Sequence, residues 1–397
     1  MDRLAFAPLL VLLPLGCSLE IGGGSDHEAP PPFENGGAGG AGGAGGVSGN
    51  CAAGQDPIDG RCVESLRRYE PPARVDFDNV VSYGEMPTEL DLPDPPRSGF
   101  RLIVPPRELG PGEELSTCIA WAYPKLRNSF VYAARLYTSG GLHHSNMYGM
   151  PLHATLGASP YPACNPDQSD LFTHAGEIAQ GIIPDVLFAN STQILGGESL
   201  IFPPGMAYEL RTTGREVVTS IHFLNPSTER KRIEIVYDFY TVSRDKLVQE
   251  LVPYYYDNFA FTVPANSTAD VSTTCNVFGG NIVSLMPHTH QRTSEFTVDL
   301  LMKDGNQQRI YTGGAYDLES DIEVFAQPIS LADVAQIRHT CTVQNDLPGP
   351  IQYGNGNNEM CTLFGYLYPP PAQGLGLVQS ADGTCSAVNI GLNRKNY

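Results

Sequence analysis

From about Gly99 onward the chain alternates short apolar runs with Gly, Pro, Asn and Asp, the residues that favour turns. The apolar runs are rich in β-branched and aromatic residues, which favour strands. Clear examples are Phe100–Val104, Val217–Phe223, Arg232–Phe239 and Glu295–Met302. The last two alternate polar and apolar positions over much of their length, as half-buried antiparallel strands do. The pattern predicts an all-β protein.

Amphipathic patterns of helical period are scarce, and the best short candidate is Ser330–Ile337, with its first residue as N-cap. Many short strands between closely spaced turn signals indicate sandwiches or jelly rolls. A chain of 397 residues also exceeds what one core usually organises. We place a seam near Thr241–Pro253, which predicts two jelly-roll-like β-sandwich domains, 98–245 and 246–397.

Residues 1–17 have the layout of a secretory signal. Arg3 precedes the apolar run Leu4–Gly16, which is too short to span a bilayer and ends at Cys17. The last residues of this run resemble a bacterial lipobox, from which Pro14 departs. Two readings stay open: the cysteine is lipidated, or the segment ends at an ordinary cleavage site. Both predict export, either anchored to a membrane only through the lipid or periplasmic or secreted.

Residues 18–50 are rich in Gly and Pro and predict a flexible tether. Within 51–97, Cys51 and Cys62 flank a short loop that contains Gly and predict a small disulfide-closed module, followed by a linker. The chain has 9 cysteines and no C-x-x-C pair. In an exported protein this pattern favours disulfides over a thioredoxin-like or zinc-ribbon site.

The formal net charge is -19 at pH 7. Binding of phosphate groups needs clustered Lys and Arg, which the sequence lacks. The charge therefore argues against nucleic acid or an anionic lipid surface as a partner.

Two closely spaced histidine pairs are the clearest candidates for metal ligands. His288 and His290 flank one threonine, and a strand points both side chains to the same face. His143 and His144 are direct neighbours, so they can bind one metal only at a bulge, a strand end or a loop. Gly140–Gly141 supplies the backbone freedom for this. Taken alone, the first pair can be a chance spacing, and the second can be one core and one surface histidine.

His222 and Met360 complete the candidate set. His222 lies inside a strand-like run, where a lone histidine is commonly structural. Met360 precedes the strand-like run Thr362–Tyr368, and a lone methionine is commonly core filler. Its thioether is also a soft ligand that copper accepts, above all Cu(I), whereas zinc hydrolases use imidazole and carboxylate.

In this order, the motifs HH, H, HTH and EMC resemble those of the type II, ascorbate-dependent copper monooxygenases. This family includes peptidylglycine α-hydroxylating monooxygenase and dopamine β-hydroxylase. The resemblance extends over roughly Phe100 to Ser386 and includes the segments GFRLIVPPRELGPGEELSTC, HHSNMYG, FPPGMAYELRTTG, SIHFLNP, MPHTHQRTSEFTVDLLMKDG and EMCTLFGYLYPP.

The resemblance implies two sandwiches with one copper ion on each, facing an open, solvent-filled cleft. The first ion passes an electron, and O2 and the substrate meet at the second, where an activated C–H bond is hydroxylated. The implied ligands of the first ion are His143, His144 and His222, and those of the second, which form the catalytic set, are His288, His290 and Met360. The implied disulfides are Cys118–Cys164, Cys275–Cys385 and Cys341–Cys361.

Two departures from the family bear on the substrate. Members that hydroxylate peptides hold the substrate carboxylate with an Arg and a Tyr, where this chain has Met286 and Phe364. We therefore expect a neutral or apolar substrate without a carboxylate. Arg292, if it shares the strand face of the HTH pair, is the candidate to replace the missing cation.

The sequence leaves three function hypotheses. The first is a copper-dependent monooxygenase that uses O2 and an external reductant such as ascorbate. The second is a non-catalytic copper-binding surface lipoprotein of the same fold. The third is a mononuclear zinc or copper protein built on the HTH pair alone.

Overall fold

The structure, a computed structural model, describes residues 55–58, 61–64, 80–82, 87–123, 126–151, 185–190, 196–211, 215–258, 260–277, 279–313, 322–354, 358–369, 378–379 and 385–389. Within these residues the chain forms strands and one short 3-10 helix, η1 (Arg244–Lys246). The all-β prediction is confirmed. The expected signal with Cys17, the tether and Cys51 lie outside the described residues.

The strands before the expected seam are β1 (Gln55–Ile58), β2 (Arg61–Glu64), β3 (Val80–Ser82), β4 (Gly99–Leu109), β5 (Glu114–Ala122), β6 (Phe130–Thr138), β7 (Leu142–Pro151), β8 (Asp185–Asn190), β9 (Gly196–Ile201), β10 (Met206–Glu209), β11 (Arg215–Leu224) and β12 (Lys231–Val242). Those after it are β13 (Gln249–Asp257), β14 (Thr262–Val263), β15 (Ser267–Asn276), β16 (Asn281–Thr289), β17 (Thr293–Met302), β18 (Gln307–Gly313), β19 (Glu323–Ser330), β20 (Val334–Asn345), β21 (Ile351–Gln352), β22 (Cys361–Tyr368), β23 (Val378–Gln379) and β24 (Ser386–Asn389).

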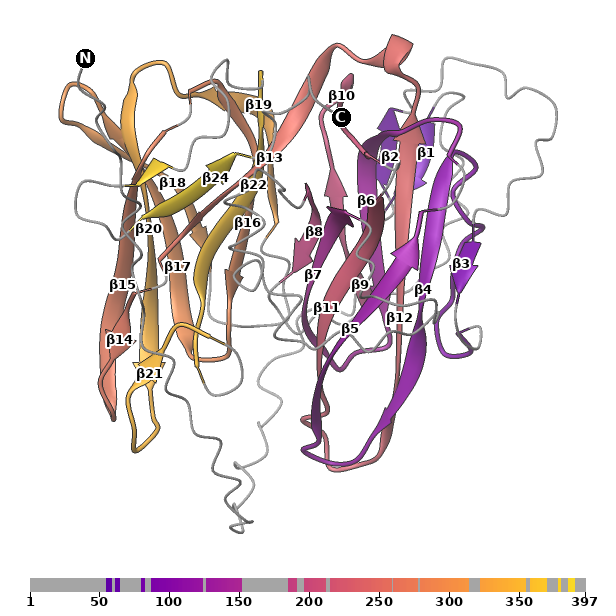
Figure 1. Ribbon diagram of the computed structural model, residues 1–397, viewed down its shortest axis with the longest axis horizontal. Coiled ribbons are helices and arrows are strands. Elements are labelled where there is room, and N and C mark those ends of the chain that lie inside the picture. The colour runs from indigo at the N-terminus through magenta and orange to yellow at the C-terminus, as the bar shows by residue number, and fades with distance from the viewer. Residues whose placement is uncertain are drawn as a thin grey trace, which may run out of the picture. The chain divides into compact units, whose positions relative to one another are not determined.

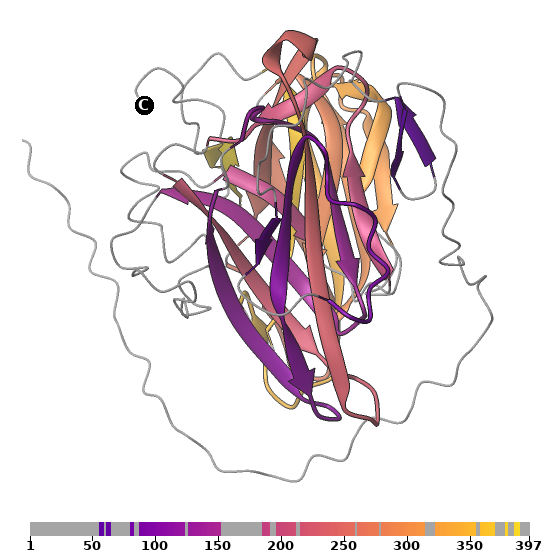
Figure 2. The same ribbon diagram turned by 90° about the vertical axis from the view of Figure 1, so that its right-hand side faces the viewer.

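The strands before the seam form two layers around one core. The sheet β5-β11-β7-β8 packs against the part of the 12-stranded sheet that runs β10-β6-β12-β4-β3. The side chains of β11 alternate between the two faces of its sheet. Ile221 and Phe223 are buried in this core, and His222 lies on the opposite face. Figure 2 shows these strands with the right-hand side of Figure 1 facing the viewer. Sandwich packing therefore leaves one face of β11 free to present a functional side chain.

The strands after the seam pack in the same manner (Figure 1). The sheet β15-β20-β17-β18 covers the part of the large sheet that runs β19-β16-β22-β13, with Phe296, Val298 and Val343 packed against Leu285 and Leu363. Along β20 every second residue is buried over much of its length, as expected for a strand with one wet face.

Both sets of strands share one sheet. β13 follows η1 and pairs in parallel with β10, from Met206↔Gln249 to Tyr208↔Leu251. Tyr366 on β22 also donates a hydrogen bond of 2.8 Å to the Val186 carbonyl on β8, on the other side of the seam. The seam at 241–253 is thus crossed by backbone pairing and by a buried side-chain contact.

The helix expected over Ser330–Ile337 is wrong. β19 ends at Ser330, a turn follows, and β20 begins at Val334. The apolar residues Leu331, Val334 and Ile337 have helical spacing, but all three are buried in the core of the second sandwich. A tight turn followed by a strand produces the same spacing, and the β-branched residues favour the strand.

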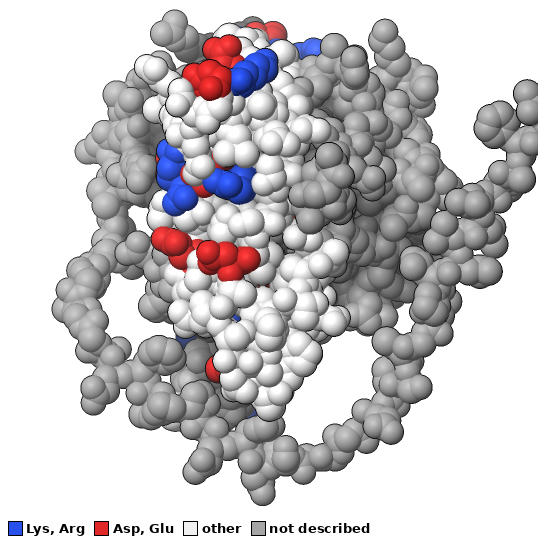
Figure 3. All heavy atoms as spheres, turned by 90° about the vertical axis from the view of Figure 1, so that its left-hand side faces the viewer, with Lys and Arg blue, Asp and Glu red and all other residues white. Residues whose placement is uncertain are grey.

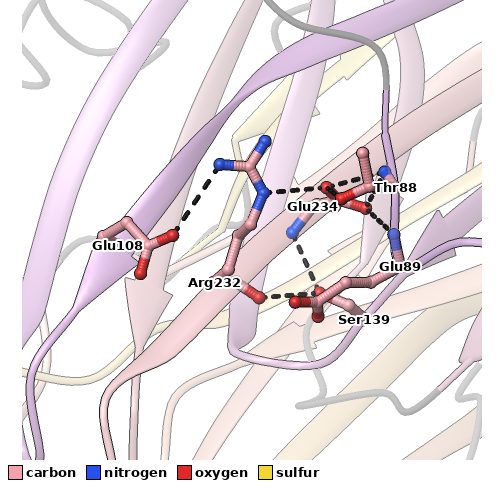
Figure 4. Close-up of polar contacts among 6 residues, drawn as sticks. All are labelled: Thr88, Glu89, Glu108, Ser139, Arg232 and Glu234. Carbon is pink, nitrogen blue, oxygen red and sulfur yellow. Dashed lines mark hydrogen bonds and ion pairs between the residues drawn. The ribbon is translucent and has the colours of Figure 1, made fainter.

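Residues 87–97 are anchored to β12 through a buried carboxylate (Figure 4). Glu234 is 1% exposed and accepts hydrogen bonds from the backbone N–H groups of Thr88 and Glu89. The Arg232 guanidinium pairs with the same carboxylate at 3.0 Å. These charge-assisted bonds fix the segment that leads into β4.

Charged side chains gather in small groups of both signs on the face shown in Figure 3. On the sheet β15-β20-β17-β18, the buried Asp299 pairs with Arg309 at 2.5 Å and with Arg338 at 3.7 Å.

Two disulfides tie the second sandwich together: Cys275–Cys385, which closes a loop of 110 residues, and Cys341–Cys361. Both pairings are those that the family resemblance implies. The side chain of Cys118, and its expected partner Cys164, lie outside the described residues, as does the Cys51 end of the expected Cys51–Cys62 bridge. Disulfides are typical of exported proteins. Among the described residues, no helix is long and apolar enough to cross a membrane.

Candidate metal centre

Five histidine side chains from β7, β11 and the end of β16 form one cluster. The ring centroid of His144 lies 4.9 Å from that of His222 and 4.7 Å from that of His290. It lies 5.1 Å from that of His288. His143 is 4.6 Å from His222. The exposed fractions range from 1% at His288 to 8% at His144 and His222. The His144 ring thus lies next to histidine rings from both sides of the seam.

A β-bulge places His143 and His144 on the same side. His222 pairs with His144 across the strands, but the next residue, Phe223, pairs with Leu142. His143 is therefore the extra residue of the bulge, which removes the strict alternation of sides. Gly140 and Gly141 before it have positive φ values of 90° and 82°. Of the three arrangements that the sequence left open, a bulge, a strand end or a loop, the structure has the bulge, with the two glycines before it.

Three of the histidines have ligand atoms that converge. The nitrogen atoms of His144, His288 and His290 lie within 4.8 Å of one another, and all three side chains are buried. Neutral imidazole is the commonest protein ligand of transition metals. These three residues can hold a metal ion.

The hydrogen bonds leave nitrogens of these rings free for a metal. His290 Nδ1 donates to the Asn358 carbonyl at 3.1 Å, which leaves Nε2 facing the cluster. Within the described part of the chain, His290 Nε2 and His144 Nδ1 have no hydrogen-bond partner. A buried polar atom without a partner is costly, so a ligand for it is expected.

Burial favours the neutral form of His143, His144, His288 and His290 by lowering the pKa of each ring. It lowers the pKa of His143 to about 2, that of His288 to about 3 and that of His290 to about 4. The pKa of His144 is also well below its usual value, first because of burial and then because of the neighbouring imidazoles. The Asn358 carbonyl opposes the shift at His290, and the Asn190 backbone opposes it at His288. Neutral rings offer the lone pairs that a metal needs.

Met360 lies beside this cluster by strand register. Thr289 pairs with Cys361, so Met360 comes immediately before β22 where His290 comes immediately after β16. The Met360 side chain is 6% exposed. The disulfide from Cys361 to Cys341 on β20 pins this strand start to the opposite sheet.

Two carboxylates contact the histidines, and neither was assigned a role from the sequence. Glu114 on β5 has its Oε1 against His222 Nε2, while His222 Nδ1 is 2.9 Å from His144 Nε2. The hydrogen bond to His222 holds the pKa of Glu114 below its usual value. Glu359 is fully buried, which raises its pKa to about 7 against the effect of three backbone N–H groups. The only sequence signal for Glu359 is its position next to Met360.

The cluster differs from the expectation of two ligand sets across an open cleft. The rings of both sets are in mutual contact and nearly excluded from solvent. β8 packs against β16 and β13 and so brings strands from the two sides of the seam together, and ligand motifs alone do not encode this packing.

The residues expected to shape the substrate site are also buried. Met286 is 0% exposed and pairs with Phe364, which is 3% exposed and lies 6.0 Å from the His288 ring. Arg292 does not share the strand face of His288 and His290, because β16 ends at Thr289. Its Nε pairs with Asp346 at 2.9 Å.

His339 lies outside the cluster, in a structural environment. It is fully buried, donates from Nε2 to the Cys361 carbonyl at 3.0 Å and stacks on Phe296 with ring centroids 5.8 Å apart. His27, His153 and His174 lie outside the described residues.

No model of a known protein family and no curated protein matches the chain. Solved structures to which it is similar include that of infectious bursal disease virus Gx strain, at 12% identity with 72% of this chain and 73% of that chain covered, and a TM-score of 0.17. The structure of the Gt strain is 11% identical, with 76% and 82% covered and a TM-score of 0.13. Likeness at these scores carries no argument about function.

Proposed function

We propose that this protein is a copper-dependent monooxygenase that hydroxylates an activated C–H bond with O2 and an external reductant such as ascorbate. The observation that carries the proposal is the cluster of five buried histidine rings, in which the nitrogen atoms of His144, His288 and His290 lie within 4.8 Å of one another. These residues come from strands far apart in the sequence, and their order matches the ligand order of the copper monooxygenases that the chain resembles.

Six residues would hold two copper ions in this proposal. The ligands are His143, His144, His222, His288, His290 and Met360. Bound copper supplies one-electron redox chemistry and a site for O2. Imidazole ligands accommodate both oxidation states of copper, and the thioether favours the reduced state. Burial of the rings excludes water, which protects a reactive centre from side reactions.

The second part of the proposal concerns the substrate. The side chains that replace the carboxylate-binding pair of peptide-hydroxylating relatives are uncharged, and Met286 and Phe364 are packed in an apolar core. A buried carboxylate without a cation is costly. We therefore propose a neutral or apolar substrate, and tight, salt-sensitive binding of small carboxylates would contradict this.

One observation favours a second candidate, a non-catalytic copper-binding protein of the same fold. The five rings are 1% to 8% exposed, which suits storage or structural binding as well as catalysis. The two candidates differ in oxygen consumption. A monooxygenase consumes O2 faster when its substrate is added with ascorbate, and a copper-binding protein does not.

The experiment that tests the proposal uses the purified full-length chain loaded with copper. We expect ascorbate-driven oxygen consumption that His144→Ala and His290→Ala abolish. His339→Gln is the matched control, because His339 is as buried but faces a carbonyl and an aromatic ring. Equal activity in all four proteins would refute the proposal.

Attachment of a lipid at Cys17 is a separate proposal, checked by the mass of the exported protein and of its Cys17→Ser variant.

A further inference from the structure

Glu359 joins two segments of the chain that carry proposed ligands. It lies directly before Met360 and is 0% exposed. One carboxylate oxygen, Oε1, accepts hydrogen bonds from the backbone N–H groups of His290 and Met360, the latter at 2.9 Å. The other oxygen accepts from the backbone N–H of Arg292 at 3.0 Å. The side chain thus binds the turn after β16 to the start of β22.

The backbone of Glu359 is itself held in place. Its N–H donates to the Gln352 carbonyl at 3.1 Å, and its carbonyl accepts from Gly354 at 3.2 Å. The preceding carbonyl, that of Asn358, accepts the Nδ1 proton of His290. The same short segment therefore sets both the backbone position and the ring orientation of His290, and it leaves Nε2 directed at the cluster.

The choice of a carboxylate here needs a reason beyond loop closure. Two turns are held by neutral amides: Asn225 donates to the carbonyls of Leu109 and Gly110, and Asn345 to that of Val263. The other buried carboxylate that accepts from backbone N–H groups, Glu234, pairs with the Arg232 guanidinium at 3.0 Å. Burying a carboxylate is more costly than burying an amide. The cost of burying the carboxylate is offset where three N–H donors converge on it and where a positive ion lies nearby. Groups behind the ligands of a metal also fix the orientation of those ligands.

We propose that Glu359 is a positioning residue of the copper centre, which holds His290 and Met360 at the spacing that lets an imidazole and a thioether reach one ion. This inference rests on the proposed copper site. It assigns no contact between Glu359 and the substrate or the metal. Its effect is exerted through the backbone of the two ligands.

The test compares the full-length wild-type protein with Glu359→Gln. Glutamine has nearly the same size, but its NH2 group cannot accept a hydrogen bond, so at least one backbone N–H loses its partner. We expect the Cu(I) affinity, measured by competition with a chromophoric Cu(I) chelator, to fall by about 10- to 100-fold. X-ray absorption of the Cu(I) form should show the sulfur scattering of the wild type reduced or lost.

Glu295→Gln is the matched control, because it removes the same charge from an exposed position on β17. It should leave both readouts unchanged. If Glu359→Gln does not fold, Glu359→Asp, which keeps the charge and shortens the side chain, replaces it. Wild-type affinity and sulfur scattering in the variant would overturn the positioning role. A wild type that retains no copper would instead overturn the proposed function. One with copper but no sulfur scattering would overturn Met360 as a ligand, and with it the positioning role, and would leave the histidine ligands in place.

Discussion

His339 is a buried histidine whose titration should be visible in the stability of the protein. Burial lowers its pKa to about 4 from the usual 6.5, partly opposed by the Cys361 carbonyl that accepts its Nε2 proton. The perturbation is His339→Gln. Glutamine keeps an N–H donor for this carbonyl but does not titrate.

The size of the effect follows from the pKa difference between the folded and unfolded states. Above pH 6.5 the ring is neutral in both states and the pH has no effect. Between pH 6.5 and 4 the unfolded chain binds a proton that the folded protein does not, so stability falls as the pH falls, by about 1.4 kcal/mol per pH unit. The total loss on reaching pH 4 is about 3 kcal/mol.

The assay is urea denaturation of the metal-free full-length protein from pH 7 to pH 4, followed by circular dichroism. Other buried histidines titrate in both proteins, so their contributions cancel in the difference between wild type and variant. We expect the variant to be the less stable protein at pH 7, because it loses the stacking on Phe296, and the gap to change by about 3 kcal/mol in its favour at pH 4. A gap that stays constant across this range would refute the reasoning.

Three further perturbations have defined outcomes. Asp238→Asn leaves the Arg101 guanidinium, 3% exposed, without its bidentate partner and should lower the free energy of unfolding by about 3 to 5 kcal/mol in urea denaturation; a loss below about 1 kcal/mol would contradict it. Replacing both Cys341 and Cys361 by Ser should lower the free energy of unfolding by about 3 kcal/mol in thermal or urea unfolding; an unchanged free energy would show that the bridge does not form. Glu234→Gln should make residues 87–97 more sensitive to limited proteolysis, and an unchanged cleavage rate would argue against the anchor.

The sequence predicts the local parts of the site because strand geometry is local. The HTH spacing requires His288 and His290 to share a face, and the structure brings them together at the end of β16. The adjacent pair at His143 and His144 can bind one metal only at a bulge, a strand end or a loop, and the register shift between β7 and β11 supplies a bulge. Periodicity and turn residues contain this information without any knowledge of the tertiary fold.

Other features of the fold and the site depend on tertiary contacts, which local sequence patterns do not specify. The helical spacing at Ser330–Ile337 arises from a turn and a strand that share one core. The contact of His144 with His290 depends on packing between sheets, which no local pattern specifies. Glu114 has no sequence signal at all, because its partner His222 is brought to it only by the pairing of β5 with β11.

The copper content of the purified full-length protein after dialysis tests the central claim most directly. We predict two copper ions per chain in the wild type and a clear loss in His144→Ala, because this ring lies between His222 on one side and His288 and His290 on the other. A wild type without bound copper, or a His144→Ala variant that retains the full content, would contradict it.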